Sequence, residues 1–508
     1  MKRILLIIVL LLTSSVMADD WPQYRGPNRD GISRETGLMK QWPEEGPPLI
    51  WKNAKLGHGV SSLAIVGDSI YTNSQLKNVE YLVCINAETG KPKWATPIAP
   101  ARNGGGGLGS KSTPAVHRGM VYTMGTSGDI VCCDAGSGKI LWRRSMVKDM
   151  GGFVPADGYG ESLLVDGKWV LCTPGGKNAT ICAMFRVNGQ PVYLSGMRPW
   201  KCSTGERASN ASIIKVSIGG TQQYIVMTEK SIMGVRVRGG DRLWSYDKFG
   251  ESQLGAMPIW YAQTIFAPAD QGSALLWPKK TAGTSTFTVN EIYNTDEFMV
   301  ARMNSPIRVN GYIFGCSEQR FACFNLKEGK LQWATEKCGK GCVCTYADGS
   351  LYVRNAHGEA FLVSANSTNF ALNGKLQIPG GSSYKGVTAP VVANGKMYIR
   401  SDSLLCCYDV SVNSEAGPQS GAAATGKPTT SSSRPFIKPT PQKPEPKTTS
   451  SAKPKAQSAP KADAVEGPEE DEDVPTFKAS STKKPAPSVD IDDPDVGAKP
   501  KRKLPGMP

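Results

Sequence analysis

Cysteine is the residue type whose chemistry stands out first in this chain, which has 508 residues and 13 cysteines. Cys132–Cys133 and Cys406–Cys407 are adjacent pairs. Both pairs stand in apolar, β-rich runs, DIVCCDA and LLCCYDV, where neighbouring side chains point to opposite faces of a sheet. Four cysteines share one place, two residues before an Asp or Asn: Cys84, Cys132, Cys323 and Cys407. We predict that they are small, buried core residues without redox chemistry.

The spacing of the other cysteines favours disulfide bonds over a metal site. Cys338, Cys342 and Cys344 are close enough to each other, or to Cys316, to pair in an oxidising compartment, but the sequence leaves their connectivity open. Only three histidines are available, and no CxxC or CxxCH spacing occurs. Zinc binding and haem attachment are therefore not expected.

The elements that position these residues belong to a repeat. Between residues 46 and 410, a β-rich run reaches a Gly, and an aromatic or bulky apolar residue follows four positions later. The clear copies end at Trp94, Trp142, Trp244 and Trp333, and the weaker copies pair Gly189 with Tyr193, Gly283 with Phe287 and Gly374 with Ile378. The seven anchors lie 43 to 51 residues apart. Periods of this size in an all-strand sequence are typical of propeller blades.

Each repeat divides into four strands, and the third and fourth are joined by a tight turn rich in Gly, Asn and Asp. The innermost strands are expected near Leu63, Ala115, Leu163, Ile213, Ile259, Ile307, Val343 and Val391. The last repeat has only three strands before the composition changes. We expect PPLIWKNA, with Trp51 in the anchor position, to supply its fourth strand and so close the ring. The sequence thus predicts an all-β, eight-bladed propeller over residues 46–411.

The two ends of the chain differ from the repeats. Residues 1–18 combine a basic start, an apolar run and small residues at the exit, which is the pattern of a secretory signal peptide. That run is too short to cross a bilayer, and no Cys stands at the cleavage position for a lipid anchor. Residues 19–45 form an N-terminal extension, and residues 412–508 form a Pro-, Ser- and Lys-rich tail that we expect to be disordered. We expect a periplasmic or extracellular protein.

Charge narrows the choice of partner. The formal net charge is +15, and nucleic acid is not expected for an exported chain without a binding motif. A protein or an anionic cell-envelope polymer is the more natural partner. We expect the chain to be a monomer.

The repeats INAETGKPKW, CDAGSGKILW and FNLKEGKLQW resemble those of the quinoprotein-like propeller family, also called the pyrroloquinoline quinone (PQQ)-like family. That family includes quinoprotein alcohol dehydrogenases, the propeller lipoprotein of outer-membrane protein assembly and many uncharacterised secreted proteins. The opening WPQYRGPNRDGIS and the stretch GYGESLLVDGKWVLCTPGGKNA are similar to the uncharacterised group. The resemblance covers about residues 20–410 and implies the propeller fold, but a fold does not fix the chemistry.

The resemblance also implies where a site would lie. The family's dehydrogenases hold the quinone and a Ca²⁺ at one mouth of the central channel, in loops that lead into the innermost strands. The corresponding positions here are His58, Lys111, Glu161, Asn210, Glu251, Arg302, Lys340 and Lys385. Glu161 and Asn210 could supply two oxygens to a hard cation, but QLGAMP in the fifth repeat lacks the Asp of a catalytic base. The set is mainly cationic, so an anion-binding mouth and a solvated rim without a ligand both stay open.

We therefore keep Lys111, Glu161, Asn210, Arg302 and Lys385 as candidate cofactor- or ligand-binding residues. We predict no metal site. The run NGGGGLGSKS from Asn103 lacks the strand-to-helix setting of a phosphate loop and is expected to be a loop over the channel mouth. Ser, His and Asp are too scattered for a catalytic triad, and we name no catalytic residue.

The resulting hypothesis is a non-enzymatic binding or scaffold module for a protein or an anionic cell-envelope ligand, with no cofactor. One alternative is a periplasmic PQQ-dependent alcohol or sugar dehydrogenase that uses Ca²⁺. Another is an outer-membrane protein assembly factor, against which the missing lipid-attachment Cys counts.

Overall fold

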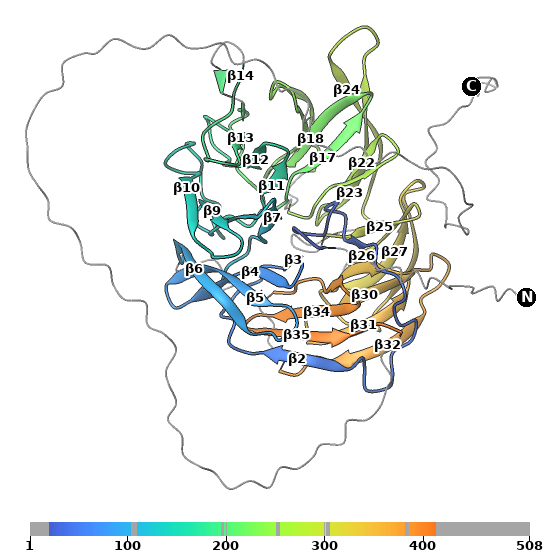
Figure 1. The fold of residues 1–508 in the computed structure, drawn as a ribbon. Coiled ribbons are helices and arrows are strands. Elements are labelled where there is room, and N and C mark those ends of the chain that lie inside the picture. The colour runs from blue at the N-terminus through green and yellow to red at the C-terminus, as the bar shows by residue number, and fades with distance from the viewer. Residues whose placement is uncertain are drawn as a thin grey trace, which may run out of the picture. The chain divides into compact units, whose positions relative to one another are not determined.

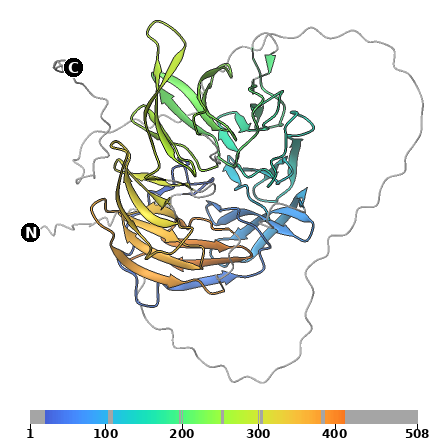
Figure 2. The same cartoon turned by 180° about the vertical axis from the view of Figure 1, so that it is seen from behind.

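The computed structural model describes residues 20–412 apart from residues 103–108, 195–197, 200, 250–254, 299, 301–304, 318 and 381–385. This part of the chain is an all-β propeller of eight blades around a central channel (Figure 1; Figure 2 shows it from behind). The predicted fold class is confirmed. No helix in this part of the chain has the length and hydropathy to cross a membrane.

Each blade is an antiparallel sheet whose first strand lines the channel. Blade one contains β3 (Ala64–Val66), β4 (Ser69–Leu76), β5 (Val79–Asn86) and β6 (Pro92–Pro100), and blade two contains β7 (Ala115–His117), β8 (Met120–Met124), β9 (Asp129–Asp134) and β10 (Ile140–Ser145). Blade three contains β11 (Leu164–Asp166), β12 (Trp169–Cys172), β13 (Ile181–Phe185) and β16 (Lys201–Cys202), and the separate pair β14 (Tyr193–Leu194) and β15 (Arg198–Pro199) precedes β16. Blade four contains β17 (Ile214–Ile218), β18 (Thr221–Met227), β19 (Ile232–Arg236) and β20 (Arg242–Tyr246).

The remaining blades follow the same order. Blade five contains β21 (Ile259–Tyr261), β22 (Thr264–Ala267), β23 (Ser273–Lys280) and β24 (Phe287–Thr295), and blade six contains β25 (Ile307–Val309), β26 (Tyr312–Ser317), β27 (Arg320–Asn325) and β28 (Lys330–Thr335). Blade seven contains β29 (Val343–Ala347), β30 (Ser350–Arg354), β31 (Glu359–Ser364) and β32 (Leu372–Gln377), with β1 (Ile32–Ser33) parallel to β29. Blade eight contains β33 (Val391–Ala393), β34 (Lys396–Ser401), β35 (Leu404–Asp409) and β2 (Leu49–Asn53).

An N-terminal strand closes the ring, as predicted. β2 pairs antiparallel with β35, and Trp51 stands directly opposite Cys407. Figure 1 shows the blue β2 beside the orange β35. The last blade therefore has four strands, and the open edge of β35 is covered.

Tryptophans of several fourth strands join one blade to the next, whereas Trp244 of blade four donates through Nε1 to Gln223 of its own blade at 2.7 Å. The Trp142 ring lies on Gly189 of blade three, where an added Cβ would come within 2.7 Å of the ring, and Nε1 donates to the Arg186 carbonyl at 2.8 Å. Gly189 also has a φ of 67°, so it meets two requirements that only glycine satisfies without strain. The same contact joins Trp51 to Gly90 and Trp94 to Gly138. This contact explains the spacing of the repeat.

The third strand supplies a small residue opposite each of these rings. Trp51, Trp94, Trp142 and Trp333 pair with Cys407, Cys84, Cys132 and Cys323 respectively. All four thiols are fully buried, as predicted. Cys132 and Cys133 pack into different hydrophobic clusters, because neighbouring residues of a strand face opposite sides.

Two of the weaker repeat assignments are wrong. In blade five Tyr293 takes the anchor place, since its hydroxyl donates to the Leu326 carbonyl at 2.6 Å and its ring lies on Gly329. Phe287 instead lies near the tip of the β23–β24 hairpin, opposite Lys280. In blade seven Gly374 is a strand residue and not a turn glycine.

The seventh blade takes its aromatic residue from outside the repeat. Trp42 of the N-terminal extension covers Gly374 and packs 6.0 Å from the Tyr352 ring. The backbone amide of Trp42 donates to the Asn373 carbonyl at 2.9 Å. A long-range contact therefore replaces the local anchor, which the spacing of the repeat cannot reveal.

Replacement of Trp142 by Ala should lower the free energy of unfolding by about 3 to 5 kcal/mol, because a buried aromatic side chain is lost from a blade interface. Urea denaturation followed by circular dichroism measures the change. Leu141→Ala is the matched control, since the neighbouring Leu141 side chain is 47% exposed and should change stability by less than about 0.5 kcal/mol. Equal stability of the two variants would contradict the interface.

Candidate functional site

The N-terminal extension runs through the central channel. Trp21 exchanges two backbone hydrogen bonds with Ile65, and the Pro22 carbonyl accepts from the Val116 amide. Ile32 and Ser33 then pair with the innermost strand of blade seven. In Figure 1 this dark blue segment crosses the centre of the ring. We call residues 20–33 the channel segment.

Two arginines fix the channel segment to opposite parts of the ring. Arg25 donates through Nη1 to the Ser305 carbonyl and through Nη2 to the Pro306 carbonyl, both at 2.7 Å. Arg29 donates to the Ser162 carbonyl at 2.8 Å and to the Leu163 carbonyl at 3.0 Å. These carbonyls occupy the same place in blades six and three, directly before the innermost strand. Each arginine therefore satisfies main-chain acceptors that face the channel.

A ring of hydroxyl groups connects the same positions of successive blades. The amides of Ser62, Thr113 and Ser162 donate to the hydroxyl oxygens of Thr113, Ser162 and Ser212, at 2.9 to 3.0 Å. In blade five the Met257 amide donates to the Ser305 hydroxyl at 2.9 Å. The sequence signal is a Ser or Thr followed by Pro, Leu or Ile directly before the innermost strand, and it is present in blades one to four and in blade six. We did not predict this role from the sequence.

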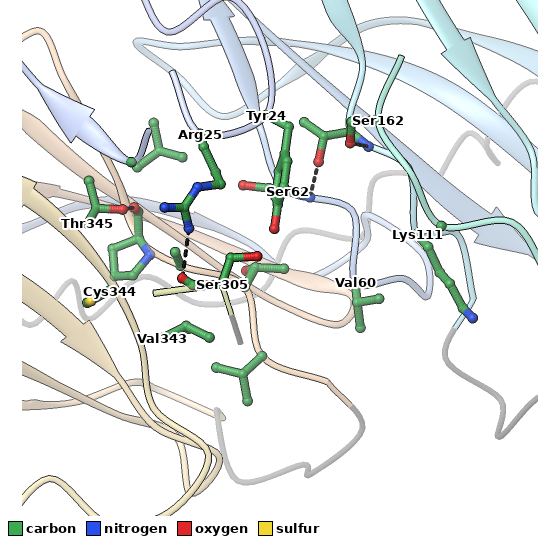
Figure 3. A pocket seen from close by; sticks show the side chains of 18 of the residues that line it. Tyr24, Arg25, Val60, Ser62, Lys111, Ser162, Ser305, Val343, Cys344 and Thr345 are labelled. Atoms are coloured by element: carbon green, nitrogen blue, oxygen red, sulfur yellow. Dashed lines mark hydrogen bonds between the residues drawn. The ribbon is translucent and has the colours of Figure 1, made fainter. Parts of the chain in front are cut away.

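A small cavity remains beside the channel segment (Figure 3). Tyr24 and Arg25 lie inside it, and Lys111 lies to one side. The volume open to water is about 70 Å³, whereas one water needs roughly 10 to 15 Å³ and small-molecule pockets have roughly 300 Å³ or more. In the described part of the chain this space suits a few water molecules and has no room for a tricyclic quinone.

The polar atoms around the cavity fit this interpretation. Trp21 Nε1, Arg25 Nε and Asn210 Oδ1 are buried and have no hydrogen-bond partner among the described residues, and all three residues line the cavity. Buried water commonly satisfies such groups. The charged side chains among the described lining residues are Arg25 and Lys111, so the cavity is cationic.

The structure separates the two predicted oxygen donors. Asn210 lines the cavity and packs on Gly160, where an added Cβ would lie 2.4 Å from Oδ1. Glu161 is fully buried, does not line the cavity, and accepts a hydrogen bond from the Thr173 amide at 2.6 Å. Within the described ranges no three His, Cys, Asp or Glu side chains gather as a metal site would require. The described residues around the cavity therefore do not fit a quinone with Ca²⁺.

Glu161 and Arg29 form a buried electrostatic pair. Burial raises the pKa of Glu161 to about 7, against which the Thr173 hydrogen bonds and the charge of Arg29 act. Burial also lowers the pKa of Arg29 to about 10, against the opposing effect of Glu161. Within the described ranges Glu161 Oε2 has no hydrogen-bond partner. Arg29 joins the channel segment to blade three through the Ser162 and Leu163 carbonyls.

The other candidate residues do not gather at one point. Lys111 donates through Nζ to the Asp157 carbonyl, and His58 is exposed, with Nδ1 2.8 Å from Asp402 Oδ2. Lys340 lines a separate depression with Arg320 and His357. Glu251, Arg302, Lys385 and the start of the run from Asn103 lie outside the described residues. Their place at the mouth stays a prediction.

Two buried arginines lie where blades seven, eight and one meet, and we did not predict them as buried contact residues from the sequence. Arg354 donates to the hydroxyl of Ser401 at 2.9 Å, and Arg400 donates to the Asn73 carbonyl at 2.6 Å. Burial lowers the pKa of Arg400 to about 9.

All thirteen cysteines carry free thiols and are buried, so none of the anticipated disulfides is present.

A comparison with family models agrees with this architecture. The model of a family described as outer membrane protein assembly factor BamB matches residues 79–335 and 195–372, which together span more than half of the chain. No protein of curated function matches the sequence.

Solved propellers resemble the chain at low identity. BamB from Moraxella catarrhalis shares 13% identity at a TM-score of 0.48, over 69% of this chain and 94% of that one. The quinohemoprotein alcohol dehydrogenase from Comamonas testosteroni shares 14% identity at a TM-score of 0.42, over 77% of this chain and 81% of that one.

Replacement of Arg25 by Ala should lower the free energy of unfolding by about 2 to 4 kcal/mol, because two buried carbonyls lose a charged donor. It should also expose the channel segment to limited proteolysis. Arg34→Ala is the control, since Arg34 is exposed and lies one residue beyond that segment. Identical proteolysis of the two variants would mean that Arg25 does not anchor the segment.

Glu161 should give stability a pH dependence. Its folded pKa of about 7 lies above the unfolded value, so between about pH 4.5 and 7 the folded state retains a proton that the unfolded state loses. Stability should fall as pH rises through this window, by at most about 3 kcal/mol. Glu161→Gln keeps the acceptor for the Thr173 amide and should remove this contribution. Parallel urea midpoints for both proteins from pH 5 to 8 would contradict it.

Proposed function

The chain belongs to the family of outer membrane protein assembly factor BamB, and on that premise we propose that it is a non-enzymatic binding or scaffold module of the cell envelope. The observation that supports this proposal is the position of the channel segment inside the central channel. Arg25 and Arg29 hold it against the residues that precede the innermost strands, on the side of the channel where the resemblance implies a quinone in the family's dehydrogenases, and the cavity beside it has room for only a few waters. Function then belongs to the faces and rim of the propeller.

The loop between β10 and β11 offers the most suitable binding surface. Phe153 is 48% exposed, and the Arg207 guanidinium lies 4.0 Å from its ring centroid. Aromatic residues and arginine are enriched among the residues that dominate protein interfaces. The loop lies beside the channel mouth, since Lys111 donates to the Asp157 carbonyl within it.

A protein of the envelope is the partner that this surface favours. An exposed aromatic ring gives affinity by burial in an apolar pocket, which a soluble anionic polymer does not offer. The net charge of +15 would speed association with an acidic partner. The name of the family supports a partner connected with outer-membrane protein assembly.

A capture experiment tests the proposal. Envelope proteins cross-linked to the mature chain are compared with those cross-linked to Phe153→Ala and to the control Trp277→Ala. Trp277 is also an exposed aromatic residue under a cation, 40% exposed with Lys279 Nζ 5.4 Å from its ring, but it lies on β23 of blade five. We expect Phe153→Ala to reduce capture of a specific protein at least about tenfold and Trp277→Ala to leave it unchanged.

Titration with PQQ and Ca²⁺ tests the alternative function. The mature chain should show no saturable heat in calorimetry and no dye-linked oxidation of alcohols or sugars, because the cavity beside the channel segment is too small for a tricyclic quinone. Saturable binding with turnover would overturn the proposal and make Asn210 the first residue to substitute.

A further inference from the structure

Three sulfur atoms meet inside blade three, away from the channel cavity. The Cys172 and Cys182 Sγ atoms are 3.5 Å apart. Met150 Sδ lies 3.7 Å from Cys172 Sγ and 3.3 Å from Cys182 Sγ. The three atoms form a compact triangle, which we call the sulfur triad.

The fold holds each member of the sulfur triad in place. Cys172 ends β12 and stands directly opposite Cys182 on β13, so the sheet sets the distance between the two thiols. Met150 belongs to the loop after β10, where the Gly151 amide donates to the Val147 carbonyl at 3.1 Å and the Phe153 amide donates to the Pro174 carbonyl at 3.1 Å. The triad is therefore preorganised by backbone contacts on both sides.

The surroundings suit a soft, weakly hydrated ion. Cys172 is 0% exposed and Cys182 is 8% exposed, and Met150 is partly buried against the same apolar cluster. Both thiols therefore lie in apolar surroundings with little access to water.

We propose that the sulfur triad binds a soft monovalent metal ion, most favourably Cu(I). This inference goes beyond the proposed scaffold role. Thiolate and thioether ligands select Cu(I) over harder ions. Three sulfurs at about 2.3 Å from a central metal lie about 4 Å apart, so the observed triangle needs to open by less than about 1 Å.

The donor set argues against zinc. Structural zinc requires four Cys, His or carboxylate ligands, and in the chain as described no third residue of these types joins the two cysteines. A thioether is a poor zinc ligand, whereas it completes a trigonal Cu(I) site.

A cross-strand disulfide is the competing state of the two cysteines. The two sulfur atoms are 3.5 Å apart, and a disulfide would form if this distance shortened to about 2 Å.

The test is a Cu(I) titration of the reduced mature chain without oxygen, against a chromophoric Cu(I) chelator. The chain should bind one equivalent that Cys172→Ser abolishes and Met150→Leu weakens at least about tenfold. Met150→Leu keeps an apolar side chain of similar volume, so it tests the site even if Cys172→Ser does not fold. X-ray absorption should show three sulfur ligands in the parent chain and two in Met150→Leu.

The other cysteine group of the chain supplies the control. Cys316→Ser alters the cluster of buried cysteines between blades six and seven and should leave the equivalent assigned to the sulfur triad unchanged. Equal Cu(I) affinity of the parent chain, Met150→Leu and Cys172→Ser would overturn the proposal. So would a Cys172–Cys182 disulfide found by peptide mass spectrometry in the chain as isolated, because both ligands would then be consumed.

Discussion

Unpaired main-chain groups on the channel wall are the constraint on which the rest of the structure depends. Eight innermost strands meet around one axis, and their channel-facing carbonyls and amides have no further strand of their own blade to pair with. A buried polar group without a partner is costly. The hydroxyl ring pairs amides of one blade with the next, while Arg25 and Arg29 pair carbonyls of blades six and three. The channel segment is therefore part of the wall.

The contacts at the periphery of the propeller differ from those at its axis. At the periphery, rings such as that of Trp142 pack against the following blade, and this contact recurs with the period of the sequence repeat. At the axis, the channel segment joins distant blades and leaves a cavity of about 70 Å³. The faces remain for recognition. Blade three departs most from the repeat, since β16 follows an inserted pair of strands, and it carries the sulfur triad and borders the Phe153 loop.

The sequence predicted the features that obey local periodicity. The blade order, the four buried cysteines opposite tryptophans and the closure by Trp51 all follow from the repeat and from alternation along a strand. The channel segment was missed because Arg25 and Ser305 are 280 residues apart, and no pattern connects them. Trp42 and Tyr293 were missed for a similar reason, since a long-range contact and a lengthened hairpin replaced the regular anchors. Asn210 lines the cavity, whereas side-chain packing, which spacing does not encode, keeps Glu161 out of it.

Hydrogen exchange of the channel segment tests the central claim most directly. Deuterium uptake of peptides covering residues 20–36 is measured in the mature chain and compared with uptake by β4 and β8. The amides of Trp21 and Gly31 donate to the Ile65 and Arg25 carbonyls, so the account predicts protection of the segment comparable with that of those strands. Exchange of the whole segment at the rate of an unstructured peptide would mean that the channel is open, and would contradict the account.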